Sequence, residues 1–456
     1  MERKNKVNLI TEKPSRALLL FALPMILGNL FQQFYNMADS MIVGRYVGED
    51  QLAAVGASYS LTTVFIMISI GGGIGASILT AQYLGAKRYR EMKTSITTAL
   101  LSFLCISILL AVFGLIFHHD ILTMLGTPKN IMEDASVYLN IYFCGLPFLF
   151  MYNVLSAMYN ALGDSKKPLY FLIFSSILNI VLDLLAVKVL KAGVAGVAWA
   201  TLIAQGISAV LSFILLMKKL HQYGEEGEQQ TIFAPYLLPQ MIKLAIPSML
   251  QQSIVSIGML LVQSVVNGFG SSVLAGYSAA SRVESICVVP MIAVGNAMST
   301  FTAQNLGANK IERVQQGYRA TYKIIFIIAS IICVILMSSH TWLIQCFLGE
   351  DSRKVAYETG TAYLSFIAFF FALIGLKATT DGVLRGSGDV VFFTISNLVN
   401  LSIRVVAAHA LANVIGVQAV WMAIPLGWGA NYLFSYIFYK KGKWKKNHVL
   451  KQVMEE

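Results

Sequence analysis

The sequence predicts an all-α integral membrane protein in which twelve membrane-spanning helices form two parallel repeats of six. Composition is the first observation behind this prediction. The 456 residues are 56% hydrophobic and 12% charged, and their mean hydropathy is +0.66. Soluble domains carry about 25% charged residues. Apolar runs of 18 or more residues recur along the whole chain, and each is long enough to cross a bilayer as a helix.

The expected spans leave only short connections, so no soluble domain of any size is expected. In chain order they cover residues 15–43, 52–78, 94–117, 135–160, 168–190, 193–217, 239–267, 275–302, 319–339, 358–384, 390–412 and 416–439. The chain then divides into five parts: a cytoplasmic tail (1–14), a first lobe (15–218), a cytoplasmic linker (219–238), a second lobe (239–440) and a basic cytoplasmic tail (441–456).

The distribution of basic residues predicts the orientation. Of the 34 Lys and Arg residues, 25 fall in or beside the termini and the even-numbered connections, and six fall in or beside the odd-numbered ones. This bias places both termini in the cytoplasm, with the chain crossing the membrane many times. The net charge of +11 therefore reflects contact with the lipid bilayer rather than with nucleic acid.

An internal repeat is the second observation. TAQYLGAKR (80–88) recurs as TAQNLGANK (302–310), and ALPMIL (22–27) recurs as AIPSML (245–250). Because six is an even number, both copies enter the membrane in the same direction. Parallel repeats of this kind are typical of transporters that expose a site to the two sides in turn. The later parts of the copies also align: Asn179 and Asp183 with Asn400 and Arg404, Gly163-Asp164 with Gly388-Asp389, and GVAGV (193–197) with GVQAV (416–420).

Carboxylates inside predicted spans are the first candidate site. Inserting an acidic side chain at the middle of a transmembrane helix costs roughly 2.5–3.5 kcal/mol on insertion scales. An acid at such a position therefore suggests a functional role. Asp39 lies in the outer third of the first span. Asp183 lies in the outer half of the fifth, one turn beyond Asn179. Together these side chains could hold one proton or coordinate one small cation. The alternative is a polar contact that only ties two helices together.

Five further charged residues of the second half are expected within the membrane. Arg282 and Glu284 are two residues apart on the eighth span and face opposite sides. Glu284 could pair with Arg404 on the eleventh span, or these side chains could contact substrate. Lys377 and Asp381 are one turn apart on the tenth span, which favours an ion pair but leaves a coupling role open.

Aromatic and methionine side chains could line a cavity for bulky apolar cations, because aromatic faces attract cations and methionine adapts to many shapes. The alternative for each is a position in the core or facing lipid. The candidates are Phe31, Tyr35, Met37, Phe150, Tyr152, Met259 and Tyr277.

Several motifs in this order resemble the multidrug and toxic compound extrusion (MATE) family, in the bacterial branch that contains the MepA- and DinF-type pumps. The resemblance covers roughly residues 15–440. The motifs are Pro24 followed by Asp39, GASILTAQYLGA with its repeated copy, ALGDSKKP after the fourth span, Asn179-x-x-x-Asp183, GVAGVAWAT at the start of the sixth span, and GVLRGSGD (382–389).

The resemblance implies a monomeric antiporter with two six-helix lobes and a central cleft. It would export cationic, amphipathic small molecules in exchange for H⁺ or Na⁺, without a cofactor. The family's cation site matches Asp39, Asn179 and Asp183, with Thr201 as the fourth member. Pro24 matches the residue at which the first helix bends. One departure is the seventh span, which has Gln251 and Gln252 where another branch of the family has a carboxylate.

Other classes of function fit less well. A flippase of lipid-linked sugars is the nearest alternative, but it needs a strongly cationic cavity, and only three bases are expected within the membrane, against four acids. A channel does not explain the repeat. An enzyme or a metal site is not expected, since the six histidines lack ligand spacing. GGGIGAS (71–77) lacks the GK[ST] ending of a phosphate-binding loop, so it predicts close helix packing.

Overall fold

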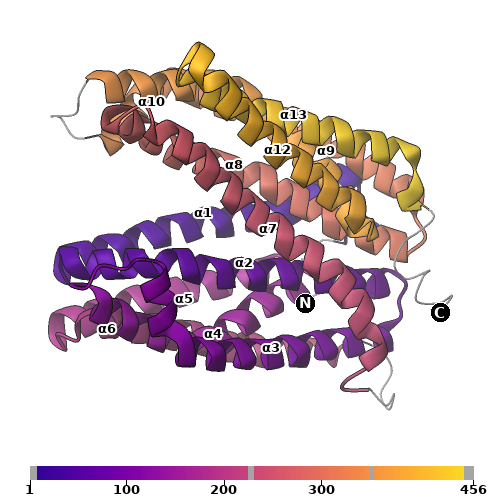
Figure 1. Cartoon of the computed structure of the whole chain (residues 1–456). Coiled ribbons are helices and arrows are strands. Elements are labelled where there is room, and N and C mark those ends of the chain that lie inside the picture. Colours follow the sequence, from indigo (N-terminus) through magenta and orange to yellow (C-terminus); the bar gives the residue numbers. More distant parts are fainter. Residues whose placement is uncertain (1–7, 224–230, 349–353, 446–456) are drawn as a thin grey trace. The chain divides into compact units, whose positions relative to one another are not determined.

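The computed structural model describes residues 8–223, 231–348 and 354–445, and within these residues the chain is helical and contains no strand. The predicted tails (1–14 and 441–456) and linker (219–238) fall partly outside this range. The helices in chain order are α1 (Pro14–Tyr46), α2 (Glu49–Gly85), α3 (Tyr89–Met124), α4 (Met132–Ala161), α5 (Lys166–Leu184), α6 (Gly193–Leu220), α7 (Leu238–Asn267), α8 (Ser271–Gly307), α9 (Ile311–Phe347), α10 (Lys354–Ile367), α11 (Phe371–Ser387), α12 (Val390–Ile415) and α13 (Gln418–Lys441). Figure 1 colours them from indigo at the N-terminus to yellow at the C-terminus.

The predicted spans correspond to these helices with one correction. The expected tenth span (358–384) is two helices, α10 and α11, separated by the 3₁₀ turn Ala368–Phe370. The sequence there contains neither Pro nor Gly, so nothing in it signalled the break. Eleven segments of the described chain are long and apolar enough to cross a membrane, and α10 and α11 count as one of them. Helix α13 is not among the eleven, because its Trp, Tyr, Asn and Gly residues lower its mean hydropathy.

The repeat extends to backbone conformation. Gly48 and Gly270, 222 residues apart, precede α2 and α8 with φ of 134° and 94°. Glycine adopts these angles without the steric cost that a Cβ atom imposes. Lys87 and Asn309, also 222 residues apart, both adopt the left-handed conformation, with φ of 58° and 56°. The two copies therefore turn between helices in the same way, as expected for two copies of one ancestral segment.

The chain forms two compact units whose boundaries differ from those of the predicted lobes. The N-terminal unit is Leu27–Met249, and the C-terminal unit is Met1–Ile26 together with Leu250–Glu456. Helices α1 and α7 are each divided between the units: the first part of α1 belongs to the C-terminal unit, and the first part of α7 belongs to the N-terminal unit. Pro24 and Pro247 each lie two residues before one of these divisions.

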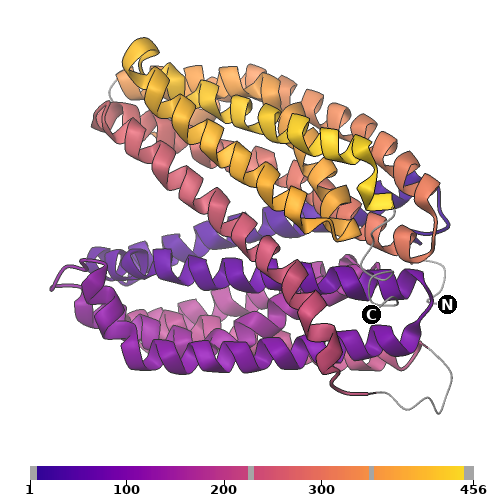
Figure 2. The same ribbon diagram turned by 45° about the vertical axis from the view of Figure 1, so that its right-hand side comes forward.

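In the N-terminal unit, α4 packs against α2, α3 and α6, and α5 packs against α6 (Figure 2). The first part of α7 lies against the glycine-rich stretch of α2. A Cβ atom on Gly75 would lie 2.4 Å from the Cα atom of Ala245, and one on Gly71 would lie 2.6 Å from that of Met249. The close helix packing predicted for GGGIGAS is thus confirmed.

In the C-terminal unit, α8 packs against α11, and α12 packs against α13. Small residues bring α8 and α11 into backbone contact. A Cβ atom on Gly382 would lie 2.4 Å from the Gly295 carbonyl oxygen, and one on Gly386 would lie 2.2 Å from that of Ser299. Gly382 and Gly386 are four residues apart, which is the spacing of the GxxxG helix-packing motif. This contact fixes the position of α11 and of the polar side chains it carries.

The segment before α1 is bound to the C-terminal unit. Leu9 is fully buried in that unit's core. Its carbonyl oxygen accepts hydrogen bonds from Asn305 Nδ2 at 3.1 Å and from Arg313 Nη2 at 3.2 Å. Arg313 also donates to the Glu12 carbonyl, and Lys310 Nζ donates to that of Ile10 at 3.2 Å. Asn305 and Lys310 belong to the repeated TAQNLGANK motif, so the motif in the second copy anchors the start of α1.

Candidate functional site

The structure brings Asp39 and Asp183 together in the N-terminal unit. Their carboxyl groups lie within hydrogen-bonding reach of each other. Asp183 is fully buried and Asp39 is partly buried. An ionised carboxylate can only accept hydrogen bonds, so this contact requires a shared proton or one cation between the two groups. The Oδ1 atom of each carboxyl group has no hydrogen-bond partner in the described part of the chain.

The Asn179 amide connects this acid pair to α6. With its nitrogen toward the acids, Asn179 donates to Asp183 Oδ2 at 3.0 Å and to the Tyr35 hydroxyl at 2.9 Å. Its oxygen then accepts from Thr201 Oγ1 at 3.2 Å and from the Thr201 backbone N–H at 3.1 Å. This orientation of the amide satisfies both of its ends, whereas the opposite one leaves only a donation to Thr201. All four residues that the sequence grouped around the cation site therefore lie together.

Two tyrosines extend the acid pair. Tyr35, expected to line a cavity, hydrogen-bonds with Thr201 and interacts electrostatically with both acids. Tyr138 on α4 also interacts with both acids, and sequence reasoning missed it. A signal was available, since Tyr138 aligns with Tyr363 at the 225-residue offset of this part of the repeat. We refer to Tyr35, Asp39, Tyr138, Asn179, Asp183 and Thr201 as the acid-pair site.

Local backbone geometry also distinguishes this site. Helix α5 ends at Leu184, directly after Asp183, and a π-helical turn follows over Leu185–Val189. π-helical turns are rare in proteins overall, but those that do occur are frequently found at functional sites. The irregular end of α5 therefore directly follows the residue that carries the buried carboxyl group, Asp183.

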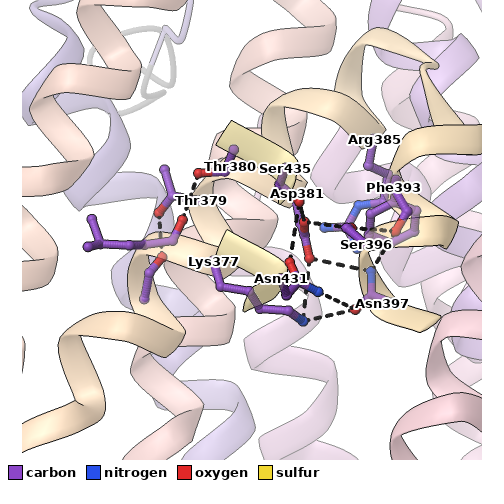
Figure 3. A network of polar contacts seen from close by, with 12 residues as sticks. Lys377, Thr379, Thr380, Asp381, Arg385, Phe393, Ser396, Asn397, Asn431 and Ser435 are labelled. Atoms are coloured by element: carbon purple, nitrogen blue, oxygen red, sulfur yellow. Dashed lines mark hydrogen bonds and ion pairs between the residues drawn. The ribbon is translucent and has the colours of Figure 1, made fainter. Parts of the chain in front are cut away.

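Lys377 and Asp381 are in the second polar cluster, in the C-terminal unit (Figure 3). The Oδ1 atom of Asp381 accepts from Ser435 Oγ at 2.6 Å and from Ser396 Oγ at 3.3 Å. Its Oδ2 atom accepts from Asn397 Nδ2 at 3.4 Å and lies 3.4 Å from Lys377 Nζ. Lys377 also donates to Asn397 Oδ1 at 2.9 Å. All five side chains are buried, and the carboxylate has four partners from α11, α12 and α13.

Arg385 lies one turn beyond Asp381 on the same helix. Its position near the expected end of the tenth span suggested a cytoplasmic connection, but its side chain is buried. It donates to Asn296 Oδ1 at 2.6 Å and to Ser299 Oγ at 3.3 Å on α8, and it lies 5.6 Å from the centre of the Phe393 ring. The sequence did not predict this role, because α11 continues three residues further than expected.

Glu284 and Arg404 belong to a third cluster, also in the C-terminal unit. The Tyr363 hydroxyl donates a short hydrogen bond to Glu284 Oε2. Arg404 interacts electrostatically with Glu284 and hydrogen-bonds with Tyr277. The ion pairs found among the described residues do not include a direct contact between Glu284 and Arg404 within 4.0 Å. The predicted pair is therefore a longer-range attraction rather than a direct salt bridge, with Tyr363 bonded to Glu284 and Tyr277 bonded to Arg404.

The remaining candidates are dispersed. Arg282 is exposed on α8, and Pro24 lies inside α1 in the C-terminal unit. Phe150 has no exposed surface, so it packs in the core and lines no cavity in this conformation. Of the other residues expected to line a cavity, Tyr277 is buried in the third cluster, Met37 and Met259 are exposed, and Phe31 and Tyr152 are half-buried. The described residues contain no group of three or more His, Cys, Asp and Glu side chains able to hold a metal ion.

Comparison with known proteins identifies the family. A family model described as MatE matches residues 24–185 and, again, residues 247–410. The probable multidrug resistance protein YoeA of Bacillus subtilis is 30% identical over 462 residues, which cover 98% of both chains. The multidrug export protein MepA of Staphylococcus haemolyticus is 22% identical over 425 residues, which cover 93% of both chains. Among solved structures, a MOP superfamily transporter from Pyrococcus furiosus has a TM-score of 0.89 and 23% identity, covering 98% of this chain and 100% of its own.

The two matches to the family model coincide with the two predicted repeats, and they confirm the resemblance that the motifs suggested. The family consists of transporters rather than enzymes, in agreement with the sequence-based expectation. With a relative 30% identical along nearly the whole length, the chain belongs to the MatE family of multi-pass membrane transporters.

Proposed function

We propose that this protein is an antiporter that exports cationic, amphipathic drugs across the bacterial cytoplasmic membrane in exchange for H⁺ or Na⁺. The acid-pair site is the proposed coupling site. The observation that carries the proposal is the contact between Asp39 and Asp183, two acids that lie close enough to need a proton or a cation between them. The relatives named as multidrug resistance and export proteins support the substrate class.

The coupling step follows from the charge of this pair. When both carboxyl groups are ionised, they attract a cationic substrate. When one proton binds, a hydrogen bond between the two groups replaces their repulsion, and this attraction weakens. A sodium ion would use the same carboxylate oxygens, with the oxygens of Asn179, Thr201 and Tyr35 as further ligands, since hard cations prefer oxygen. In either case ion and substrate compete for one negative site.

Pro24 is the proposed bending point of α1 during this cycle. It has no backbone N–H and cannot donate to the carbonyl of Leu20, so the helix has one hydrogen bond fewer there. In the proposed cycle, ion binding at Asp39 changes how the second part of α1 packs on α5, and the helix bends at Pro24. The two units then change which side of the membrane has access to the site.

The test is efflux in proteoliposomes of the purified protein under separately imposed proton and sodium gradients, with ethidium as the cationic substrate. We expect one gradient to drive transport, and we expect Asp39→Asn and Asp183→Asn to abolish it while the protein remains folded. Asp120→Asn is the matched control, because Asp120 is exposed at the end of α3. Undiminished gradient-driven efflux by Asp39→Asn would show that the acid pair is not the coupling site.

The lipid-linked sugar flippase that the sequence left as an alternative would bind a diphosphate, so it would need a strongly cationic site. The acid-pair site has the opposite charge. Transport of a fluorescent lipid-linked oligosaccharide by the same proteoliposomes, insensitive to Asp39→Asn, would favour that alternative.

A further inference from the structure

Basic and aromatic side chains gather where α9 begins and α13 ends. Arg319 and Lys323 are one turn apart near the start of α9, and both are exposed. Lys440 is exposed at the end of α13, and its Nζ atom lies 5.4 Å from the centre of the Tyr436 ring. Arg319 interacts electrostatically with Tyr439, whose ring centre is 6.2 Å from that of Tyr436. Cations from two helices therefore meet at one aromatic surface.

Tyrosine side chains join α9 to α13 beside these cations. The ring centre of Tyr318 lies 4.1 Å from that of Tyr439. The Tyr322 hydroxyl donates to the Tyr318 hydroxyl at 2.6 Å and lies 3.0 Å from that of Tyr432. Trp444 stacks on Tyr439, with the ring centres 5.4 Å apart. Packed and hydrogen-bonded rings thus fix the two helix ends that carry the basic residues.

The first repeat lacks the basic residues of α9. In the alignment of TAQYLGAKR with TAQNLGANK, Arg319 corresponds to Thr97 and Lys323 corresponds to Leu101 on α3. Leu101 is exposed, as Lys323 is. Because α3 forms an equivalent helix with uncharged residues at these positions, the fold itself does not require the two charges. A ligand specific to the C-terminal unit would explain them.

Carboxylates of the protein do not occupy these cations. The ion pairs of residues 8–223, 231–348 and 354–445 include none that involves Arg319, Lys323 or Lys440. Lys443 differs, because it interacts electrostatically with Asp389. Within the described chain, the three cations at the aromatic surface therefore remain available to an external anion.

The length of α9 places Arg319 near the level of lipid headgroups. The 37 residues of α9 correspond to about 55 Å, whereas the hydrocarbon core of a bilayer is about 30 Å thick. Arg319 lies about 12 Å from the start of the helix and Lys323 about 18 Å. Half of the excess length is also about 12 Å. Arg319 is thus at the edge of the hydrocarbon, and the long Lys323 side chain can extend to the same level.

The exposed surface becomes apolar one turn further along each helix. On α9, the exposed Phe326 and Ile327 follow Lys323 by three and four residues. On α13, the exposed Ile437 precedes Lys440 by three residues. Both helices therefore combine a basic end with an apolar strip on one face. A phospholipid has this arrangement of a charged headgroup and acyl chains, whereas a free phosphate matches the basic end alone.

We propose that Arg319, Lys323 and Lys440 bind the phosphodiester headgroup of an anionic phospholipid. Its acyl chains lie along the exposed apolar residues of α9 and α13. The guanidinium fork donates to the phosphate oxygens, and the two ammonium groups add positive charge. Basic sites between membrane helices bind anionic headgroups in this way. The bound lipid bridges α9 and α13 and stabilises the C-terminal unit. This inference does not depend on the proposed export or coupling.

The test titrates the purified full chain in mild detergent with phosphatidylglycerol or phosphatidylcholine that have the same acyl chains. Native mass spectrometry measures the Kd of the first bound lipid. We expect the wild type to bind phosphatidylglycerol more tightly, because choline neutralises the phosphate. Arg319→Gln/Lys440→Gln should raise the Kd of phosphatidylglycerol about thirtyfold, the equivalent of about 2 kcal/mol for two basic side chains. It should leave the Kd of phosphatidylcholine within about twofold.

Lys166→Gln/Lys167→Gln is the matched control, because it removes the same charge at the start of α5 in the N-terminal unit. It should leave the Kd of phosphatidylglycerol within about twofold. Arg319→Lys/Lys440→Arg retains both charges and should keep the preference for the anionic lipid. If the double variant does not fold, Arg319→Gln alone should raise this Kd about fivefold.

Thermal unfolding provides a second measurement. Phosphatidylglycerol should raise the unfolding midpoint of the wild type more than that of Arg319→Gln/Lys440→Gln, since a ligand stabilises the state that binds it. Equal weakening by the control pair would show an effect of net charge alone and overturn the proposal. Unchanged lipid binding in Arg319→Gln/Lys440→Gln would also overturn it. Displacement of the lipid by an equal concentration of glycerol phosphate would assign the surface to a soluble phosphate ester and reject the lipid.

Discussion

Lys377 and Asp381 lie one turn apart on α11, with the Nζ atom of the lysine 3.4 Å from the Oδ2 atom of the aspartate. Both side chains are buried, and serines and asparagines of α12 and α13 occupy the other positions around them. The amine thus takes the place that an exchangeable cation would take beside a lone carboxylate. In the acid-pair site no basic side chain has this role among the described contacts of Asp39 and Asp183.

Removal of the lysine should therefore destabilise the C-terminal unit. Lys377→Met leaves the buried Asp381 without its counter-charge, and breaking a buried pair in this way costs roughly 3–5 kcal/mol. We expect a lower unfolding midpoint in detergent and recovery of most of the loss in Lys377→Met/Asp381→Leu. Lys354→Met is the control, since the Lys354–Glu358 pair is exposed and contributes about 0–1 kcal/mol. Equal stability of the single and double variants would contradict the argument.

Thr201 should tune the affinity of the acid-pair site for its ion. Thr201→Val keeps the side-chain volume and removes the Oγ1 atom that holds the Asn179 amide toward the acids. A hydrogen bond of this kind contributes about 1 kcal/mol, or roughly a fivefold change in an equilibrium constant. The half-saturating ion concentration for efflux should rise by about this factor. Thr97→Val is the control, because the Thr97 hydroxyl bonds only to backbone carbonyls of its own helix. An unchanged ion dependence would remove Thr201 from the site.

The contacts of Arg313 should control the mobility of the segment before α1. Arg313→Gln removes donors to the carbonyls of Leu9 and Glu12. We expect hydrogen–deuterium exchange of the amides of residues 8–12 to become faster, because local opening costs less when fewer contacts hold a segment. Arg319→Gln, an exposed site on the same helix, should leave the exchange unchanged. Equal protection in both variants would show that burial of Leu9 is sufficient.

The contact between α8 and α11 should tolerate no added side chain. Gly386→Ala places a Cβ atom 2.2 Å from the Ser299 carbonyl oxygen, so the helices must separate. Overpacking of this kind costs about 1–3 kcal/mol. Gly429→Ala in α13 meets nothing within 4 Å and should be neutral or stabilise by about 0.5–1 kcal/mol, because alanine favours helix. Thermal unfolding in detergent measures both variants. A stable Gly386→Ala protein would indicate that α8 and α11 are less tightly packed.

The sequence was sufficient to predict most of the helices, the repeat and the grouping of Asp39, Asn179 and Asp183, and the resemblance to the MATE family added Thr201. Depth along a helix follows from residue number, and helical periodicity places Asn179 and Asp183 on one face. The same periodicity predicted the contact between Lys377 and Asp381, because both residues are on one helix.

Contacts between helices were harder to predict, since they depend on how each helix is rotated about its axis. The sequence placed Glu284 and Arg404 at similar depth but did not show that Tyr277 and Tyr363 are their hydrogen-bond partners. Tyr138 was missed because tyrosine is common in apolar helices, and only its alignment with Tyr363 distinguishes it. Arg385 was assigned to a connection because a charge near the end of a hydrophobic run is more often outside the membrane than inside it.

The exchange of helix segments between the units has a consequence for how this protein could have arisen. Residues 8–26 belong to the C-terminal unit, and the first part of α7 belongs to the N-terminal one. A single ancestral copy would have had no second unit to receive its leading segment. It would have been complete only as an intertwined homodimer, in which each chain gave its first helical turns to the other. In the present single chain the aligned positions Asp183 and Arg404 have opposite charges, which two identical subunits could not have.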